Sequence, residues 1–332
     1  MPETADRAGA RPETADDQPV SPPPGPRFGG ASRWVDIGGP VHYLDFGGPA
    51  DGPVIVGVHG LNGSAVNWAA IAPLLTSHYR LLAPDLVGHG MTRSSGRSAK
   101  VPANRALLHR FIETVTGSPV ILMGNSMGGM ISLSEAAAAP DTVAGLILLD
   151  PALPFVPVRS NLMIAAIFVV YAIPGLGQRL IRRGRGLSAE QMVAGVLELC
   201  CGDVTRVSRA TIEQHVEMAR RRAAFTDGER DFLTASRSVV AESAYLTGRS
   251  YRRAVHSVGR PALLLHGTAD RLVPVASARR AARAHPAWTF VELPGVGHVP
   301  QLEAPQDCAK LITEWLSTTG RPAAEAATPP PG

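Results

Sequence analysis

A serine set among glycines has the surroundings that a nucleophile needs. The run Gly124-Asn125-Ser126-Met127-Gly128-Gly129 follows the apolar segment Val120–Met123 and precedes a segment with a helical pattern. A sharp strand-to-helix turn presents a serine hydroxyl at the edge of a sheet, and flanking glycines relieve the crowding of that turn. The pattern therefore predicts that Ser126 attacks an electrophilic carbon. The amide of Met127, at the start of the helix, would face the negative charge that develops.

A base and an acid for this serine stand later in the chain. A serine hydroxyl is a weak nucleophile unless a base, itself held by a carboxylate, removes its proton. Two motifs that follow apolar segments supply candidates, namely His266-Gly267-Thr268-Ala269-Asp270 and Gly297-His298. We expect His298 to act as general base and then as general acid, and Asp270 to orient it.

Asp150 offers a second carboxylate for the same role. It ends another apolar segment, in Leu148-Leu149-Asp150-Pro151. Asp270 is favoured because it lies in the turn after a later strand and is followed by Arg271-Leu272-Val273-Pro274. Asp150 stays open as the alternative triad acid. Otherwise we expect it to cap the start of the segment that follows it.

Apolar segments alternate with helical patterns in both halves of the chain. Strands are expected over residues 41–46, 54–58, 80–83, 120–123, 146–149, 262–265 and 289–293. Helices are expected over residues 67–75, 103–115, 127–138, 275–284 and 305–316. Buried apolar strands that alternate with helices predict an α/β fold, with a mainly parallel, doubly wound sheet covered on both faces.

A long interruption divides this pattern. Residues 151–258 lack a clear strand pattern, and an insertion at this point would lie over the carboxyl ends of the strands, where open α/β sheets bind ligands. We expect a helical cap there, between a first core part (31–150) and a second one (259–319). The proline-rich ends, 1–30 and 320–332, are expected to be disordered tails because they contain too little apolar surface to offset their ordering entropy.

Taken together, these motifs resemble those of the α/β-hydrolase fold superfamily, in particular its serine esterases and lipases with a helical cap. The resemblance covers about residues 34–318 and includes two further motifs after strands, His59-Gly60-Leu61 and Pro84-Asp85-Leu86-Val87-Gly88-His89-Gly90. It implies an oxyanion hole made by the backbone amides of Leu61 and Met127. It also implies chemistry without a metal or an organic cofactor.

The identity of the nucleophile restricts the reaction. Haloalkane dehalogenases and epoxide hydrolases of this superfamily use aspartate where this chain has Ser126. A carboxylic ester hydrolase that forms an acyl-enzyme is therefore the first hypothesis. The glycine-rich motif also resembles that of C–C bond hydrolases of ring-cleavage diketone acids, but those usually carry an aromatic residue after the histidine, where this chain has Val299. A silent ligand-binding member of the fold is a third hypothesis, disfavoured by the complete triad.

The expected cap has an apolar and basic composition. Met163–Ile173 is strongly apolar but too short to cross a bilayer. It is followed by Arg179, Arg182, Arg183 and Arg185. A lid that meets a lipid-like substrate or a membrane surface is one interpretation, and a helix packed on the core is the other. We expect a small-molecule or lipid-like ester as the partner, with peripheral membrane contact through the cap as an open alternative.

Charge and cysteine content exclude several other classes of protein. The formal net charge is +4, carried almost wholly by arginine, and we expect no nucleic-acid partner. Cys200, Cys201 and Cys308 are odd in number and lack ligand spacing with histidines, which argues against a disulfide framework and a zinc site. The amino terminus does not resemble a secretory signal. These features predict a cytoplasmic protein.

Overall fold

The structure, a computed structural model, describes residues 28–154, 173, 175–183, 186–244 and 247–319. Nearly all of the two expected tails and most of the apolar segment Met163–Ile173 lie outside the described residues.

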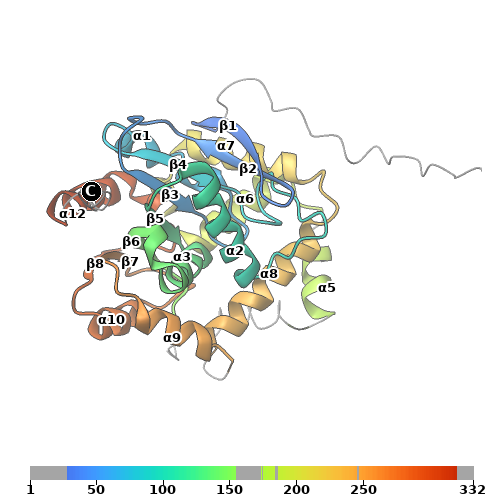
Figure 1. Cartoon of the computed structure of the whole chain (residues 1–332). Helices are drawn as coiled ribbons and strands as arrows, with labels where there is room; N and C mark the ends of the chain where they lie inside the picture. The colour runs from blue at the N-terminus through green and yellow to red at the C-terminus, as the bar shows by residue number, and fades with distance from the viewer. Residues whose placement is uncertain (1–27, 155–172, 174, 184–185, 245–246, 320–332) are drawn as a thin grey trace, which may run out of the picture.

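One eight-stranded sheet forms the centre of the molecule, in the order β1-β2-β4-β3-β5-β6-β7-β8 (Figure 1). The strands are β1 (Ala31–Asp36), β2 (Pro40–Asp45), β3 (Val54–Val58), β4 (Arg80–Pro84), β5 (Val120–Asn125), β6 (Val143–Leu149), β7 (Ala262–Gly267) and β8 (Thr289–Leu293). β2 pairs antiparallel with β1 and β4, and all other pairs are parallel. The predicted mainly parallel α/β sheet is confirmed.

Two hydrophobic cores lie on the two faces of the sheet. Alternate residues of each strand enter opposite cores, so that Leu122 belongs to one and Met123 to the other. The first core is covered by α2 (Val101–Phe111), α3 (Met127–Ala138) and α10 (Val275–Ala284). The second is covered by α1 (Ala72–Leu75) and α12 (Pro305–Thr318). Burial on both faces explains why the central strands are apolar throughout.

Two elements differ from the sequence-based expectation. β1 was not predicted, because it is an edge strand whose side chains are largely exposed and which therefore lacks an apolar pattern. The helix expected over residues 67–75 is instead a 3₁₀ turn (Ala65–Trp68) followed by the short α1. Pro73 explains the interruption, since it lacks a backbone N–H and its ring clashes with the carbonyl of the preceding turn.

The described residues between β6 and β7 form only helices and turns. We call this segment, residues 151–258, the helical insert. It contains α5 (Leu176–Arg183), α6 (Ala189–Cys200), a 3₁₀ turn (Val204–Arg206), α7 (Arg209–Arg222), α8 (Gly228–Ser243) and α9 (Arg249–Ser257). The insert leaves the carboxyl end of β6 and returns to β7 through α9, which packs against α3 (Figure 1). Among the described residues, no helix has the length and apolarity to cross a membrane.

Candidate active site

Ser126 occupies the turn between β5 and α3 in a strained conformation. Its φ is 55° and its ψ is −119°, a region that non-glycine residues rarely adopt and that costs about 1–3 kcal/mol. The turn is held by the backbone, because the Ser126 carbonyl accepts from the amides of Met130 (3.1 Å) and Ala152 (2.9 Å). A Cβ on Gly128 would lie 1.9 Å from the carbonyl oxygen of Val58, so only glycine fits there.

The loop after β3 lies beside this turn. A Cβ on Gly60 would be 3.1 Å from the Cβ of Ser126, which places the backbone before Leu61 against the serine. His59 fixes this loop, since its Nε2 accepts from the Leu86 amide (3.0 Å) and its Nδ1 donates to the Gly60 carbonyl (2.8 Å). Burial lowers the pKa of His59 and favours this neutral form.

The loop after β4 is built around a buried carboxylate. Asp85 accepts hydrogen bonds from the amides of Ala65 (2.7 Å) and Met91 (2.8 Å) and from Nδ1 of His42 (2.7 Å). Gly90 is needed beside it, because its φ is 51° and a Cβ would lie 2.0 Å from the Asp85 carboxyl carbon. Asp85 therefore organises the loop after β4.

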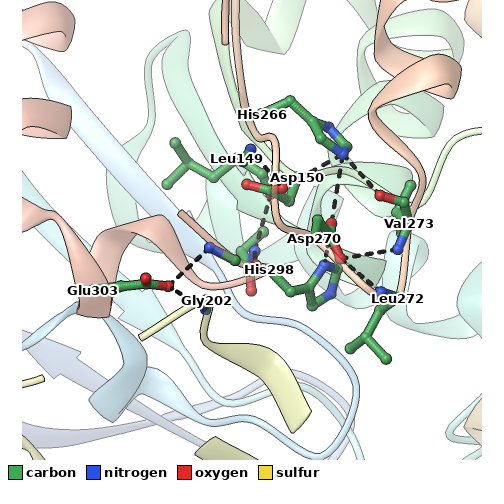
Figure 2. A network of polar contacts seen from close by, with 12 residues as sticks. Leu149, Asp150, Gly202, His266, Asp270, Leu272, Val273, His298 and Glu303 are labelled. Carbon is green, nitrogen blue, oxygen red and sulfur yellow. Dashed lines mark hydrogen bonds and ion pairs between the residues drawn. The ribbon is translucent and has the colours of Figure 1, made fainter. Parts of the chain in front are cut away.

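Asp270 and His298 face each other across the ends of β7 and β8. Oδ2 of Asp270 accepts from Nδ1 of His298 at 2.8 Å, while Oδ1 accepts from the amides of Leu272 (2.7 Å) and Val273 (3.0 Å) (Figure 2). Both residues are buried. Because backbone donors fix one oxygen, the other is held against the imidazole. Nε2 is thus the ring nitrogen left to exchange a proton with a substrate or nucleophile.

Asn125 connects the histidine loop to the serine turn. Its Nδ2 donates to the carbonyls of His298 (2.9 Å) and Leu149 (3.0 Å). Among the described hydrogen bonds, none joins the Ser126 hydroxyl to the His298 ring. In unliganded active sites such bonds are often long and shorten only with substrate. The structure thus places the serine turn and the Asp270–His298 pair in one connected unit.

Asp150 lies deeper than Asp270 and contacts it. Oδ1 of Asp150 accepts from the Gly267 amide at 2.9 Å, and its buried Oδ2 has no hydrogen-bond partner among the described residues. Burial, followed by the charge of Asp270, raises the pKa of Asp150 well above its usual value. Burial acts in the same direction on Asp270, but the facing His298 outweighs it and lowers the pKa of Asp270. The carboxylate paired with His298 is therefore Asp270, and Asp150 forms no ion pair with His298 among the described residues.

A metal site is the alternative use of these groups. Asp150, His266 and Asp270 each offer a ligand atom, and the three atoms lie within 4.8 Å of one another. The sequence spacing gave no sign of this cluster. Three of the candidate ligand atoms are engaged in hydrogen bonds: Oδ1 of Asp150 with Gly267, Oδ2 of Asp270 with His298, and Nε2 of His266 with the Val273 carbonyl (2.9 Å). Oδ2 of Asp150 and Nδ1 of His266 have no hydrogen-bond partner among the described residues. The cluster thus matches a hydrogen-bond network better than a metal site.

Sequence reasoning missed Glu303. Its buried carboxylate accepts from the amides of Gly297 (2.8 Å), Gly202 (2.9 Å) and Asp203 (2.9 Å) (Figure 2). The only local signal is that Glu303 is an acidic residue five positions after His298, directly after the uncharged run Pro300-Gln301-Leu302. This signal does not predict which groups Glu303 binds, because Gly202 and Asp203 lie about a hundred residues earlier in the chain.

A model of the alpha/beta hydrolase family matches residues 55–311 of this chain. The chain belongs to the alpha/beta hydrolase family. The match contains β3 to β8, the serine turn, Asp270 and His298.

Similar proteins within this family have different roles. The chain is 27% identical over 283 residues to the magnesium-chelatase 30 kDa subunit of Rhodobacter capsulatus, covering 81% of this chain and 88% of that protein. It is 28% identical over 269 residues to the pimeloyl-[acyl-carrier protein] methyl ester esterase of Aromatoleum aromaticum, covering 79% and 97%. The crystal structure of Cfl2 from Burkholderia cenocepacia is similar with a TM-score of 0.73 and 23% identity, covering 88% and 97%, a likeness that shows the shared fold.

Proposed function

We propose that this hydrolase cleaves a carboxylic ester through an acyl-enzyme formed on Ser126. The observation that carries the proposal is the Asp270–His298 hydrogen bond of 2.8 Å, whose acid is fixed by two further backbone amides. It supports an imidazole that holds a proton on Nδ1 and leaves Nε2 to take the serine proton. The strained Ser126 turn supports a hydroxyl presented for attack.

The proposed reaction has two halves. Nε2 of His298 takes the Ser126 proton as the serine oxygen attacks the ester carbonyl, and the amides of Leu61 and Met127 stabilise the oxyanion. His298 then gives its proton to the leaving alcohol. A water molecule, activated by the same nitrogen, attacks the acyl-enzyme, and the acid is released with Ser126 restored. Asp270 remains ionised throughout and stabilises the imidazolium.

The exposed side chains of the helical insert support the proposal that the acyl group of the substrate is apolar. Six of the eight exposed large hydrophobic side chains among the described residues belong to it, namely Ile173, Leu176, Leu187, Met192, Val196 and Leu199. Apolar side chains gathered in one segment are typical of surfaces that meet apolar ligands. Val299 stands where C–C bond hydrolases usually carry an aromatic residue, and it packs in a small cluster with Leu197 and Leu302. The absence of an aromatic side chain at this position favours the ester over the C–C bond substrate.

The Ser126→Ala variant tests the proposal. It should lose nearly all ester turnover and all labelling by a fluorophosphonate probe, because the hydroxyl is a reactant. Ser134→Ala is the matched control, since the Ser134 hydroxyl only donates to the Met130 carbonyl within α3 (2.8 Å). A folded Ser126→Ala protein that still hydrolyses esters above background would refute the proposal. A substrate panel with p-nitrophenyl esters and one vinylogous 1,5-diketone acid separates the two reaction classes.

A further inference from the structure

Glu303 joins two segments that lie far apart in the sequence. One is the turn of the helical insert between α6 and α7, whose Gly202 and Asp203 amides point at the carboxylate. The other is the histidine loop, whose Gly297 amide donates to the same carboxylate. Hydrogen bonds from N–H groups to an ionised carboxylate are roughly twice as strong as neutral ones, and this side chain is fully buried.

The two segments also meet directly through their backbones. The His298 amide donates to the Cys200 carbonyl, at the end of α6, at 2.6 Å. A Cβ on Gly297 would lie 2.2 Å from that same carbonyl oxygen. A Cβ on Gly202 would lie 2.3 Å from the carbonyl oxygen of Gly295. Only glycines permit so close an approach, and the position of the insert therefore sets the position of the histidine loop.

We propose that Glu303 is a positioning residue for His298, through which the helical insert holds the catalytic base in place. This inference rests on the proposed function, since it assigns His298 the role of base. Glu303 touches neither the imidazole nor Ser126 in the described contacts. It acts by fixing the backbone amide of the residue before His298, while Cys200 fixes the amide of His298 itself.

The arrangement explains why a carboxylate is required. Oε2 serves Gly297 and Gly202, and Oε1 serves Asp203, so both oxygens must be acceptors. Arg206 is the cation beside it, with Nη1 at 3.6 Å from Oε1 and a side chain 45% exposed. At that distance and exposure Arg206 contributes little, and the three amides do most of the holding.

Glu303→Gln tests the inference from the side of the core. Glutamine keeps the shape but has one acceptor oxygen, and its amide group would oppose a backbone N–H. A displacement of a catalytic group by about 1 Å can cost about 10²-fold in rate. We expect kcat to fall by about 10- to 10²-fold and the fluorophosphonate labelling rate to fall in parallel, with KM nearly unchanged. Arg206→Gln is the matched control and should retain wild-type values.

Gly202→Ala tests the same inference by changing the helical insert, at a residue that is not part of the triad. The added methyl must push the turn away from Gly295, and kcat and labelling should fall in the same way. Both variants are measured well below their unfolding midpoints, so that loss of folded protein is not scored as loss of activity. If Glu303→Gln fails to fold, Gly202→Ala decides.

Wild-type kcat and labelling in either folded variant would overturn the positioning role, even where the unfolding midpoint is lowered. Failure of the proposed function is distinguishable, because it appears in Ser126→Ala and not in these variants. An active Ser126→Ala protein contradicts the triad, whereas active Glu303→Gln and inactive Ser126→Ala contradict only the positioning role.

Discussion

Replacing Asp270 by asparagine should reverse the tautomer of His298. Oδ1 of Asp270 accepts from two backbone amides, at Leu272 and Val273, and Oδ2 accepts from Nδ1 of His298. An asparagine has one acceptor oxygen, and two amide donors hold it more strongly than one. Its NH₂ group is then directed at Nδ1, which must become an acceptor. The ring proton moves to Nε2, where His298 can no longer take the proton of Ser126.

The size of this effect follows from the loss of both the correct tautomer and the charge that stabilises the imidazolium. A change of this kind costs about 10⁴ in kcat in the serine protease that serves as the template for the triad. We expect a fall of that order for Asp270→Asn, with KM changed little, measured as steady-state hydrolysis of one good p-nitrophenyl ester at pH 7–8. The unfolding midpoint should fall only modestly, since the amide contacts are kept.

Asp150→Asn is the matched control on the neighbouring strand. Burial, followed by the charge of Asp270, raises the pKa of Asp150, so the neutral amide of asparagine replaces a carboxyl group whose ionisation is disfavoured. Its oxygen can still accept from Gly267 and its NH₂ can donate to Asp270. We expect kcat within about tenfold of wild type, or about 1.4 kcal/mol. A large loss of kcat in Asp150→Asn, together with near wild-type kcat in Asp270→Asn, would refute the assignment of Asp270 as the triad acid. A large loss in both variants would contradict the hypothesis that a single carboxylate orients His298.

Three further expectations can be measured on the same protein. Turnover should survive EDTA, because Asp270 is held against His298 and Nε2 of His266 against the Val273 carbonyl, which leaves the proposed reaction independent of a metal; loss on chelation with recovery on adding metal would contradict this. The kcat/KM for p-nitrophenyl esters should rise from two to eight acyl carbons, by up to about 0.8 kcal/mol or fourfold per methylene, and a flat series would argue against an apolar acyl site. Burial is the main cause that lowers the pKa of His89 from 6.5 to about 3, and the neighbouring His59 and Arg222 act in the same direction. The native state therefore resists protonation that the unfolded chain accepts, and the free energy of unfolding should fall as pH drops from about 6.5 towards 3, by up to about 1.4 kcal/mol per unit from this group. Urea unfolding of His89→Gln should show a shallower dependence, and an unchanged slope would contradict the argument.

The local pattern of apolar and polar residues predicts the central strands and several of the helices that flank them. β3, β8, α3 and α10 have the residue limits expected from the sequence, because buried apolar strands and regular helices leave a signal within a short window. The sequence pattern does not predict an element whose formation depends on pairing with a neighbouring strand. β1 exists because it pairs with β2, and its own side chains are mostly exposed. Pro73 is the local signal against a continuous helix over residues 67–75, since proline is favoured only in the first turn, where it stands in α1.

The residues of the site also fall into those with a local sequence motif and those that depend on contacts between distant segments. Ser126, Asp270 and His298 each stand in a short motif after a strand, and the topology alone brings strand ends together. Their chemical roles stay predictions until tested. Glu303 and the state of Asp150 depend instead on contacts between distant segments. The pKa of Asp150 is raised first by burial and then by the charge of Asp270, and the residues on either side of Asp150 in the sequence reveal neither cause.

The strained turn at Ser126 also limits which side chains can occupy the position. Its φ of 55° crowds a branched Cβ against the backbone, and the space beside that Cβ is taken by Gly60. Threonine carries the same hydroxyl as serine but a second heavy atom on Cβ, so the turn rejects it on shape before its chemistry matters. Serine, cysteine and aspartate have no branch at Cβ and avoid this clash. The shape of the turn thus discriminates against a second alcohol side chain more than against a thiol or a carboxylate, although threonine is chemically the nearer replacement.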